Sequence, residues 1–309
     1  MSDVFFLDAS VPHAMATYLK GLGWLGGEET VLSAGRAGEG NMNCTLRVHT
    51  AQRSFILKQS RPWCEKFPHI PAPEERALIE AAFYLLVESK RSIADRMPRL
   101  LGFDEEARVL MLEDLGAASD FTRLYGGEHL ADADLAALVQ FAADLHGGFT
   151  AGPHMSNLAM RKLNHEYIFE LPLAEVNGGS AFERRVRQLG DMYLGTGPCL
   201  LHGDYFPGTW LHVDGSVKVI GPEFCFFGPA EFEIGVMLAH LYLARQPEGT
   251  LRGAVDGYRK IAPLNEVLTR QFAGVEIMRR PVGVSQLPLP YGDGERRGLL
   301  EKAIGMTMC

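Results

Sequence analysis

The order of a short β-rich segment and a longer helical one most constrains how this chain can fold. Residues 45–50 (TLRVHT) and 54–59 (SFILKQ) alternate between the two faces of a strand and are rich in β-formers, and the AQR between them fits a hairpin connection. Residues 71–90 predict a helix, because apolar residues recur at helical spacing after Pro71 and two acids. Residues 108–116 then predict a buried strand that leaves into a loop.

Beyond that loop the chain is predominantly helical. Residues 130–149 and 180–194 predict amphipathic helices, and residues 232–245 are so apolar that they predict a helix inside a core. The chain has 309 residues, which is enough for two cores of ordinary size. We therefore expect an α+β protein with a small β-rich lobe at residues 1–115 and a larger helical lobe at residues 116–309.

The net charge of the chain argues against two classes of binding partner. The formal net charge of −8 argues against a protein that coats nucleic acid or an anionic membrane, because both need a positive protein surface. No apolar run approaches the roughly 18 residues of a spanning helix, and the first residues lack the basic-then-apolar order of a secretion signal. We expect a cytoplasmic protein that binds a small molecule, with no nucleic-acid or membrane partner.

Two features of the β-rich part point to a nucleotide. Residues 35–44 (GRAGEGNMNC) hold three glycines, and a loop without side chains can bring backbone N–H groups close to phosphate oxygens, although a plain turn fits the same residues. Lys58 lies on the second predicted strand and Glu80 on the helix that follows, and a strand lysine held by a helix glutamate can direct its ammonium at nucleotide phosphates. A solvated lysine and a surface glutamate are the alternative, which the neighbouring glycines disfavour.

Two acidic residues follow short apolar runs in the helical part. Asp204 in the tripeptide HGD comes after CLL, where its carboxylate can accept the proton of an attacking hydroxyl. Glu223 in VKVIGPEF comes after a β-branched run and a turn with Pro222. If the two strand ends face one cleft, they present a base and a metal ligand together.

The segments HGDYFPGTWL and VIGPEFCFFGPAEFEIG resemble the aminoglycoside phosphotransferase superfamily and, within it, the 5-methylthioribose kinases. Those kinases carry an HGD loop, a DPEF-type metal motif and a following GP..FDIG. GEGNMNCTLRV resembles the glycine loop of those kinases, FILKQSRPW their lysine strand, and EERALIE the helix that carries the glutamate partner of the lysine. LMLEDL resembles their hinge, and GVEIMRRPVG their arginine pair. The resemblance therefore covers about residues 35 to 285.

The resemblance implies a protein-kinase-like two-lobe fold and an ATP- and Mg²⁺-dependent transfer of a phosphoryl group to a hydroxyl of a small substrate, a sugar such as methylthioribose. It implies Asp204 as the catalytic base, Glu223 and Asp204 as metal ligands, and Arg279 and Arg280 as contacts to the substrate or its phosphoryl group. For the arginines, a basic pair at a helix end on the surface is the alternative. A homodimer is implied as well. The implied cofactor-binding residues are Gly38, Gly40, Asn41, Lys58, Glu80, Leu112, Glu113 and Asp114.

Three positions depart from the pattern of the family. Gly221 stands where the family has its first metal carboxylate, Thr209 where it has Asn or Ser, and Glu233 where it has the Asp of FDIG. Loss of a principal metal ligand costs several kcal/mol of transition-state stabilisation, or about a thousandfold in rate. The sequence leaves open a slow kinase that relies on Glu223, a pseudokinase that only binds nucleotide or sugar, and an Asp-to-Gly change in this chain. A phosphotransferase for an aminoglycoside or a choline-like cation is a further alternative.

Overall fold

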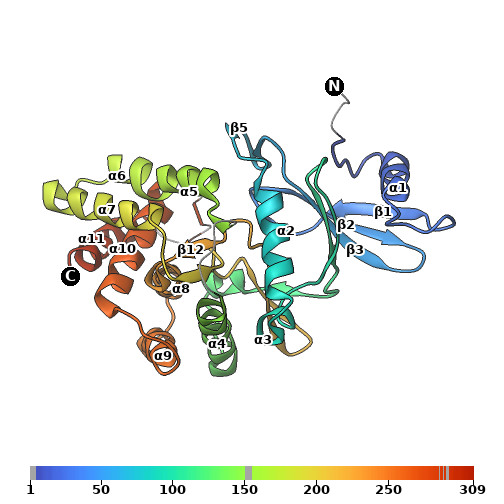
Figure 1. The fold of residues 1–309 in the computed structure, drawn as a ribbon. Helices are drawn as coiled ribbons and strands as arrows, with labels where there is room; N and C mark the ends of the chain where they lie inside the picture. Colours follow the sequence, from blue (N-terminus) through green and yellow to red (C-terminus); the bar gives the residue numbers. More distant parts are fainter. Residues whose placement is uncertain (1–4, 150–154, 285, 288, 290–291) are drawn as a thin grey trace. The chain divides into compact units, whose positions relative to one another are not determined.

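The computed structural model describes residues 5–149, 155–284, 286–287, 289 and 292–309. The chain divides into two compact units, Met1–Gly116 and Ala117–Cys309. Unit 1 holds the large antiparallel sheet, and unit 2 holds most of the helices (Figure 1). The expected α+β class, with a small β-rich part before a larger helical part, is confirmed.

Unit 1 is built on a five-stranded antiparallel sheet with the strand order β1-β2-β3-β7-β6. The predicted hairpin is confirmed, since β2 pairs with β3 and places Thr45 opposite Lys58. The predicted buried strand is also present as β7, which lies between β3 and β6. The strands of the unit are β1 (Val31–Arg36), β2 (Cys44–Thr50), β3 (Ser54–Gln59), β4 (Trp63–Cys64), β5 (Phe67–Pro71), β6 (Leu100–Asp104) and β7 (Val109–Glu113).

The two faces of this sheet have different neighbours. Helix α1 (Pro12–Gly21) contributes Leu19 to a core that also contains Phe55 and Leu57 of β3. Because side chains alternate along a strand, Lys58 points to the opposite face. On the opposite face α2 (Arg76–Val87) packs against β6 and β7, and the short α3 (Arg91–Ala94) follows it.

Helix α2 begins at Arg76, so the predicted start at Pro71 is wrong. Pro71 belongs to β5, which pairs with β4, and the chain turns before the helix starts. Pro71 and Pro73 have no backbone N–H group to donate, and the helix begins only after both of them, with Glu75 as the N-cap. The acids Glu74 and Glu75 therefore lie before the first helical turn and not in it.

Arg76 is completely buried and joins three segments of unit 1. Its Nε donates to the side-chain oxygen of Asn43 at 2.8 Å. Its terminal nitrogens donate to the carbonyl oxygens of Arg61 (2.9 Å), Pro73 (2.7 Å), Met42 (2.9 Å) and Trp63 (3.3 Å). Guanidinium has five N–H donors in one rigid plane, which suits it to this set of acceptors. Arg76 thus holds the end of the glycine-rich loop against β4 and the start of α2.

Unit 2 contains the three helices that the sequence predicts, as α4, α7 and α8. Helix α8 is buried along nearly its whole length, as its apolar sequence requires. It packs against α10, α10 packs against α11, and α4 packs against α9 (Figure 1). The helices are η1 (Phe121–Gly126), α4 (Asp132–Gly148), α5 (Leu158–His165), the π-helix η3 (Glu166–Glu170), α6 (Leu171–Ala174), α7 (Gly179–Leu194), α8 (Ala230–Leu243), α9 (Glu248–Arg259), α10 (Glu266–Val282) and α11 (Asp293–Thr307).

Short strands in unit 2 place two loops side by side. Strand β9 (Cys199–Leu201) pairs with β12 (Phe226–Gly228), so the residues just after β9 lie beside those just before β12. Strand β10 (Trp210–Val213) pairs with β11 (Ser216–Val219) and with β8 (Ser119–Asp120). The two loops carry HGD and GPE. No helix in the described part of the chain is both long and apolar enough to cross a membrane.

Replacing Arg76 by methionine should destabilise unit 1 by about 3 kcal/mol, because several buried acceptors lose their donor. Urea unfolding followed by circular dichroism measures the loss. Arg91→Met is the matched control, since that side chain is 89% exposed and its replacement should cost less than about 0.5 kcal/mol. Equal losses for the two variants would contradict the role given to Arg76.

Candidate active site

The HGD loop is held by the buried carboxylate of Glu233 on α8. Its Oε1 accepts the backbone N–H of His202 at 3.1 Å, and its Oε2 accepts that of Gly203 at 2.8 Å. His146 of α4 donates to the same carboxylate from Nε2 at 2.9 Å. Burial alone would raise the pKa of Glu233, but the hydrogen bonds from His146 and from the backbone of Gly203 lower it below its usual value. Glu233 therefore stays ionised and fixes the loop backbone.

Two further side chains, His202 and Asn157, hold the GPE loop. The Nε2–H of His202 donates to the carbonyl oxygen of Ile220 at 2.9 Å, while its Nδ1 accepts the backbone N–H of Asp204 at 3.3 Å. The side-chain amide of Asn157 donates to the carbonyl oxygens of Glu223 and Cys225, each at 3.0 Å. The histidine of HGD thus ties its own loop to the second one.

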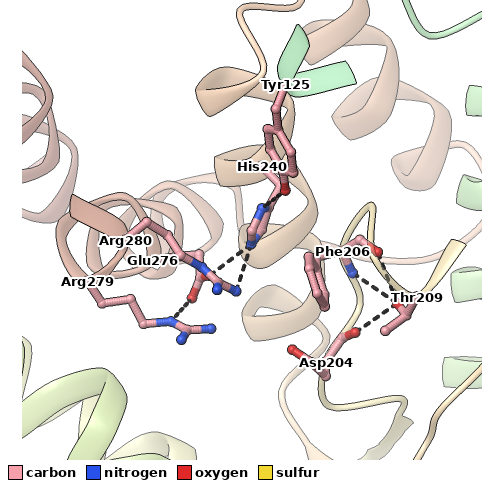
Figure 2. A network of polar contacts seen from close by, with 8 residues as sticks. All are labelled: Tyr125, Asp204, Phe206, Thr209, His240, Glu276, Arg279 and Arg280. Carbon is pink, nitrogen blue, oxygen red and sulfur yellow. Dashed lines mark hydrogen bonds and ion pairs between the residues drawn. The ribbon is translucent and has the colours of Figure 1, made fainter. Parts of the chain in front are cut away.

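Asp204 is half-buried in the HGD loop. Burial raises the pKa of its carboxyl to about 7, with Arg280 and Arg279 opposing the rise and Glu223 and Glu276 adding to it. A carboxylate whose pKa lies near neutrality is suited to accept a proton from a hydroxyl. The carbonyl oxygen of Asp204 lies 2.9 Å from the hydroxyl of Thr209 (Figure 2). The hydroxyl that replaces the expected Asn or Ser therefore contacts the loop backbone.

Glu223 and Gly221 decide how a metal can be bound. Glu223 is buried, and its negative charge contributes to the raised pKa of Asp204. Two carboxylates fit the preference of Mg²⁺ for one or two acidic protein ligands besides phosphate and water. Gly221 adds no side chain and has a φ of +74°, a left-handed conformation that Asp tolerates better than most residues. No group of three or more His, Cys, Asp or Glu able to hold a metal occurs among the described residues.

The arginine pair is largely buried near Asp204, so the alternative of a surface pair at a helix end is wrong. Arg280 is 4% exposed, and the side chain of Arg279 is 13% exposed. Glu276 on the same helix accepts from the Nε of Arg279 at 2.6 Å and from the Nε of Arg280 at 2.7 Å. The counter-charge of Glu276 is what allows two guanidinium groups to be buried together.

His240 contacts the carboxylate of Glu276, and Tyr125 contacts His240 in turn (Figure 2). The Nε2 of His240 lies 2.9 Å from Oε1 of Glu276, and the hydroxyl of Tyr125 contacts Nδ1 of His240. In front, the guanidinium of Arg280 lies over the ring of Phe206, 5.3 Å from its centre. Phe206 belongs to the HGD loop, so α10 and that loop are in direct contact.

In unit 1, Lys58 and Glu80 form a buried ion pair with 2.8 Å between Nζ and Oε1. The alternative of a solvated lysine and a surface glutamate is therefore wrong. Removing one member of a buried pair typically costs 3–5 kcal/mol, because the other charge is left buried without its partner. Its action on nucleotide phosphates stays a prediction.

The glycine-rich loop connects β1 and β2. Gly38 has a φ of +73°, which favours glycine at that position. The guanidinium of Arg36 donates to the carbonyl oxygens of Gly38 at 3.3 Å and Gly40 at 3.2 Å, and the carbonyl oxygen of Asn41 accepts the N–H of Lys66 at 3.0 Å. These contacts use the carbonyl groups of the loop. Phosphate binding by its N–H groups stays a prediction.

The predicted hinge lies at the end of β7, where Leu112 is buried. Glu113 pairs with Arg99 at 3.2 Å, and Asp114 pairs with Arg47 at 3.0 Å. Burial would raise the pKa of Asp114, but hydrogen bonds from Ser54 and Gly116 and the charge of Arg47 lower it. Both acidic side chains are thus paired inside unit 1, and contact of the hinge with adenine stays a prediction.

Several residues of the site were not predicted from the sequence. Glu276 could have been, because it precedes the two arginines by three and four residues, the spacing of neighbours on a helix. Asn157, His240 and Tyr125 come from distant parts of unit 2 and carry no local signal. Glu233 was noted only as a departure from a motif, and its hold on the HGD backbone was not foreseen.

Gly203 permits the close approach of the two loops and gives a direct test of that packing. Its φ is +87°, and an added Cβ would lie 2.1 Å from the carbonyl oxygen of Phe224. Gly203→Ala should therefore cost about 3 kcal/mol, from backbone strain plus steric overlap. Gly215→Ala is the control, because its φ is +76° with no atom within 4 Å of an added Cβ, and it should cost about 1 kcal/mol. Denaturant unfolding compares them, and equal costs would refute the close packing.

The chain is similar to proteins of one enzyme family. The sequence profile of the phosphotransferase enzyme family matches residues 34–264. The methylthioribose kinase of Exiguobacterium sibiricum is 27% identical over 328 aligned residues, covering 85% of this chain and 82% of that protein. Methylthioribose kinase 1 of Oryza sativa subsp. japonica is 26% identical over 254 residues, covering 71% of this chain but only 58% of that protein.

The choline kinase LicA from Streptococcus pneumoniae superimposes with a TM-score of 0.60 at 13% identity, covering 96% of this chain and 99% of LicA. That likeness shows the fold alone, and the expected protein-kinase-like fold is confirmed. The profile match spans well over half of the chain, and the expected phosphotransferase is confirmed at the level of the family. The chain belongs to the phosphotransferase enzyme family.

Proposed function

We propose that this protein is an ATP-dependent kinase that transfers the γ-phosphoryl group to a hydroxyl of a small sugar of the methylthioribose type. Membership of the phosphotransferase enzyme family supports the reaction. The relatives named methylthioribose kinase support the class of acceptor.

The buried arginine pair beside Asp204 is the observation that carries the proposal. Arg279 and Arg280 lie close enough to Asp204 for their charges to lower its pKa. Guanidinium groups bind anionic and hydroxyl oxygens through paired N–H donors. Such a subsite favours an oxygen-rich acceptor or the phosphoryl group itself, and it opposes a cation.

Each unit has its own task in this reaction. Asp204 would hold the acceptor hydroxyl and take its proton, and Glu223 with Asp204 would hold Mg²⁺. The metal, when bound, neutralises charge that develops on the transferred phosphoryl group. Lys58, aligned by Glu80, would contact the nucleotide phosphates, with Gly38, Gly40 and Asn41 in the loop nearby.

Gly221 makes a slow or inactive kinase the second candidate. The chain retains the Lys58–Glu80 pair and the charged surroundings of Asp204, and these support an enzyme. An Asp at position 221 would face a left-handed backbone, which costs it about 1 kcal/mol. That cost is small beside the effect of a metal ligand on the transition state, so the substitution is a practical test.

A kinase for a cationic acceptor is the third candidate. It calls for an acidic pocket in unit 2, and a pocket of about 410 Å³ there includes Glu170, Glu175 and Glu183 in its lining, with Arg187. Neither Asp204 nor the arginine pair lines that pocket. The acidic pocket therefore gives no support for bringing a cation to the proposed base.

ADP release with methylthioribose, other sugars, choline and an aminoglycoside tests the proposal. We expect methylthioribose to be the best acceptor. Asp204→Asn should lower kcat about a thousandfold by removing the base, and Gly221→Asp should raise kcat by adding a metal ligand. Asp214→Asn, in an exposed turn of the same unit, should change kcat less than twofold.

Three results would contradict the proposal. Activity that occurs only in the Gly221→Asp variant would favour the pseudokinase. Release of ADP with choline or the aminoglycoside, but with no sugar, would favour the cationic acceptor. Equal activity of the wild type and Asp204→Asn would remove Asp204 from the reaction.

A further inference from the structure

We infer that Glu276 is the positioning residue of the acceptor subsite and that it acts by setting the orientation of Arg279. The inference rests on the proposed function for the identity of the acceptor. Glu276 itself touches no substrate in this account, and it acts through the two arginines that follow it on α10.

Glu276 is buried and binds both arginines, which fixes the orientation of their guanidinium groups. The residue is 1% exposed, and each of its carboxylate oxygens accepts one Nε–H group, from Arg279 and from Arg280. Binding through Nε fixes the plane of a guanidinium while its terminal nitrogens extend beyond the carboxylate. Figure 2 shows the guanidinium of Arg279 projecting past Glu276 in this manner.

Within the described part of the chain, the terminal nitrogens of Arg279 have no hydrogen-bond partner, which leaves them for a ligand. Among the residues that the structure describes, the hydrogen bond found for Arg279 is that of its Nε to Glu276. Its charge also lies near enough to influence Asp204. An oriented donor pair close to the proposed base is what the acceptor or its phosphoryl group needs.

The charge balance of this cluster sets the class of ligand. Burial would raise the pKa of Glu276, but Arg279 and Arg280, together with the hydrogen bond to His240, hold it well below its usual value. Glu276 is therefore ionised and offsets one of the two guanidinium charges. One net positive charge remains in the cluster, which suits hydroxyl oxygens or a single anionic group.

The support behind Glu276 shows that its position is itself fixed. An ionised carboxylate only accepts hydrogen bonds, so the Nε2–H of His240 donates to it at 2.9 Å. The Nδ1 of His240 then accepts the hydroxyl of Tyr125. Burial, with the charge of Arg280 next, lowers the pKa of His240 to about 4, so the imidazole is neutral near pH 7.

Calorimetry and kinetics on Glu276→Gln test this role against a purely structural one. A glutamine keeps the volume but loses the charge and one Nε acceptor. We expect the Kd and KM for methylthioribose to rise about tenfold, with the Kd for ADP changed less than twofold. Glu266→Gln, at the other end of α10 in an exposed pair with Arg259, is the matched control and should change neither.

Equal loss of sugar and ADP affinity in Glu276→Gln, or an unchanged sugar affinity, would overturn the inference. Tyr125→Phe is a milder variant for the case in which Glu276→Gln does not fold. It removes only the hydroxyl behind His240 and should raise the KM for the sugar severalfold at constant kcat. No change in that KM would also overturn the inference.

A second readout separates this inference from the proposed function. Without Glu276, Arg279 should be modified severalfold faster by phenylglyoxal, because its guanidinium loses both its holder and the charge that keeps it protonated. Mass spectrometry gives the rate, with Glu266→Gln again as control. If the wild type binds no sugar, the proposed function fails, and the labelling rate alone decides the role of Glu276. An unchanged rate would refute it.

Discussion

The hold of Glu233 on the backbone of the HGD loop is the interaction on which the rest of the site depends. A buried carboxylate is costly unless N–H donors surround it, and here they come from His202, Gly203 and His146. The hydrogen bonds that offset the cost of burying the Glu233 carboxylate also hold the HGD loop in one conformation. The position of Asp204, which follows directly, is set by that conformation.

Buried charges recur at the points where the proposed chemistry takes place. Lys58 is paired with Glu80 in unit 1, and Glu276 is paired with two arginines in unit 2. Such clusters add little net stability compared with apolar packing, and they fix the directions of charged groups. We therefore interpret them as parts of a binding site, with the apolar core of each unit supplying the stability.

Local patterns in the sequence predicted most of the fold. The hairpin alternates, residues 130–149 and 180–194 have helical spacing, and the strand at the hinge and residues 232–245 are largely apolar. All of these elements are present. The start of α2 was predicted too early, because the pairing of β5 with β4 overrides the helix signal near Pro71. The contact between Arg280 and Phe206 joins distant residues, and no local pattern encodes it. The burial of the arginine pair depends on such tertiary contacts. The pairing with Glu276 could have been predicted, because Glu276 precedes the arginines by three and four residues on one helix.

The central claim is that the loops of unit 2 bind a metal through Glu223 and Asp204 although Gly221 supplies no ligand. A crystal structure of the full chain with a non-hydrolysable ATP analogue and Mg²⁺ tests it most directly. We predict a magnesium ion coordinated by Glu223 and Asp204, with the analogue's phosphates among its other ligands. A bound analogue with no metal at Glu223 would contradict the account.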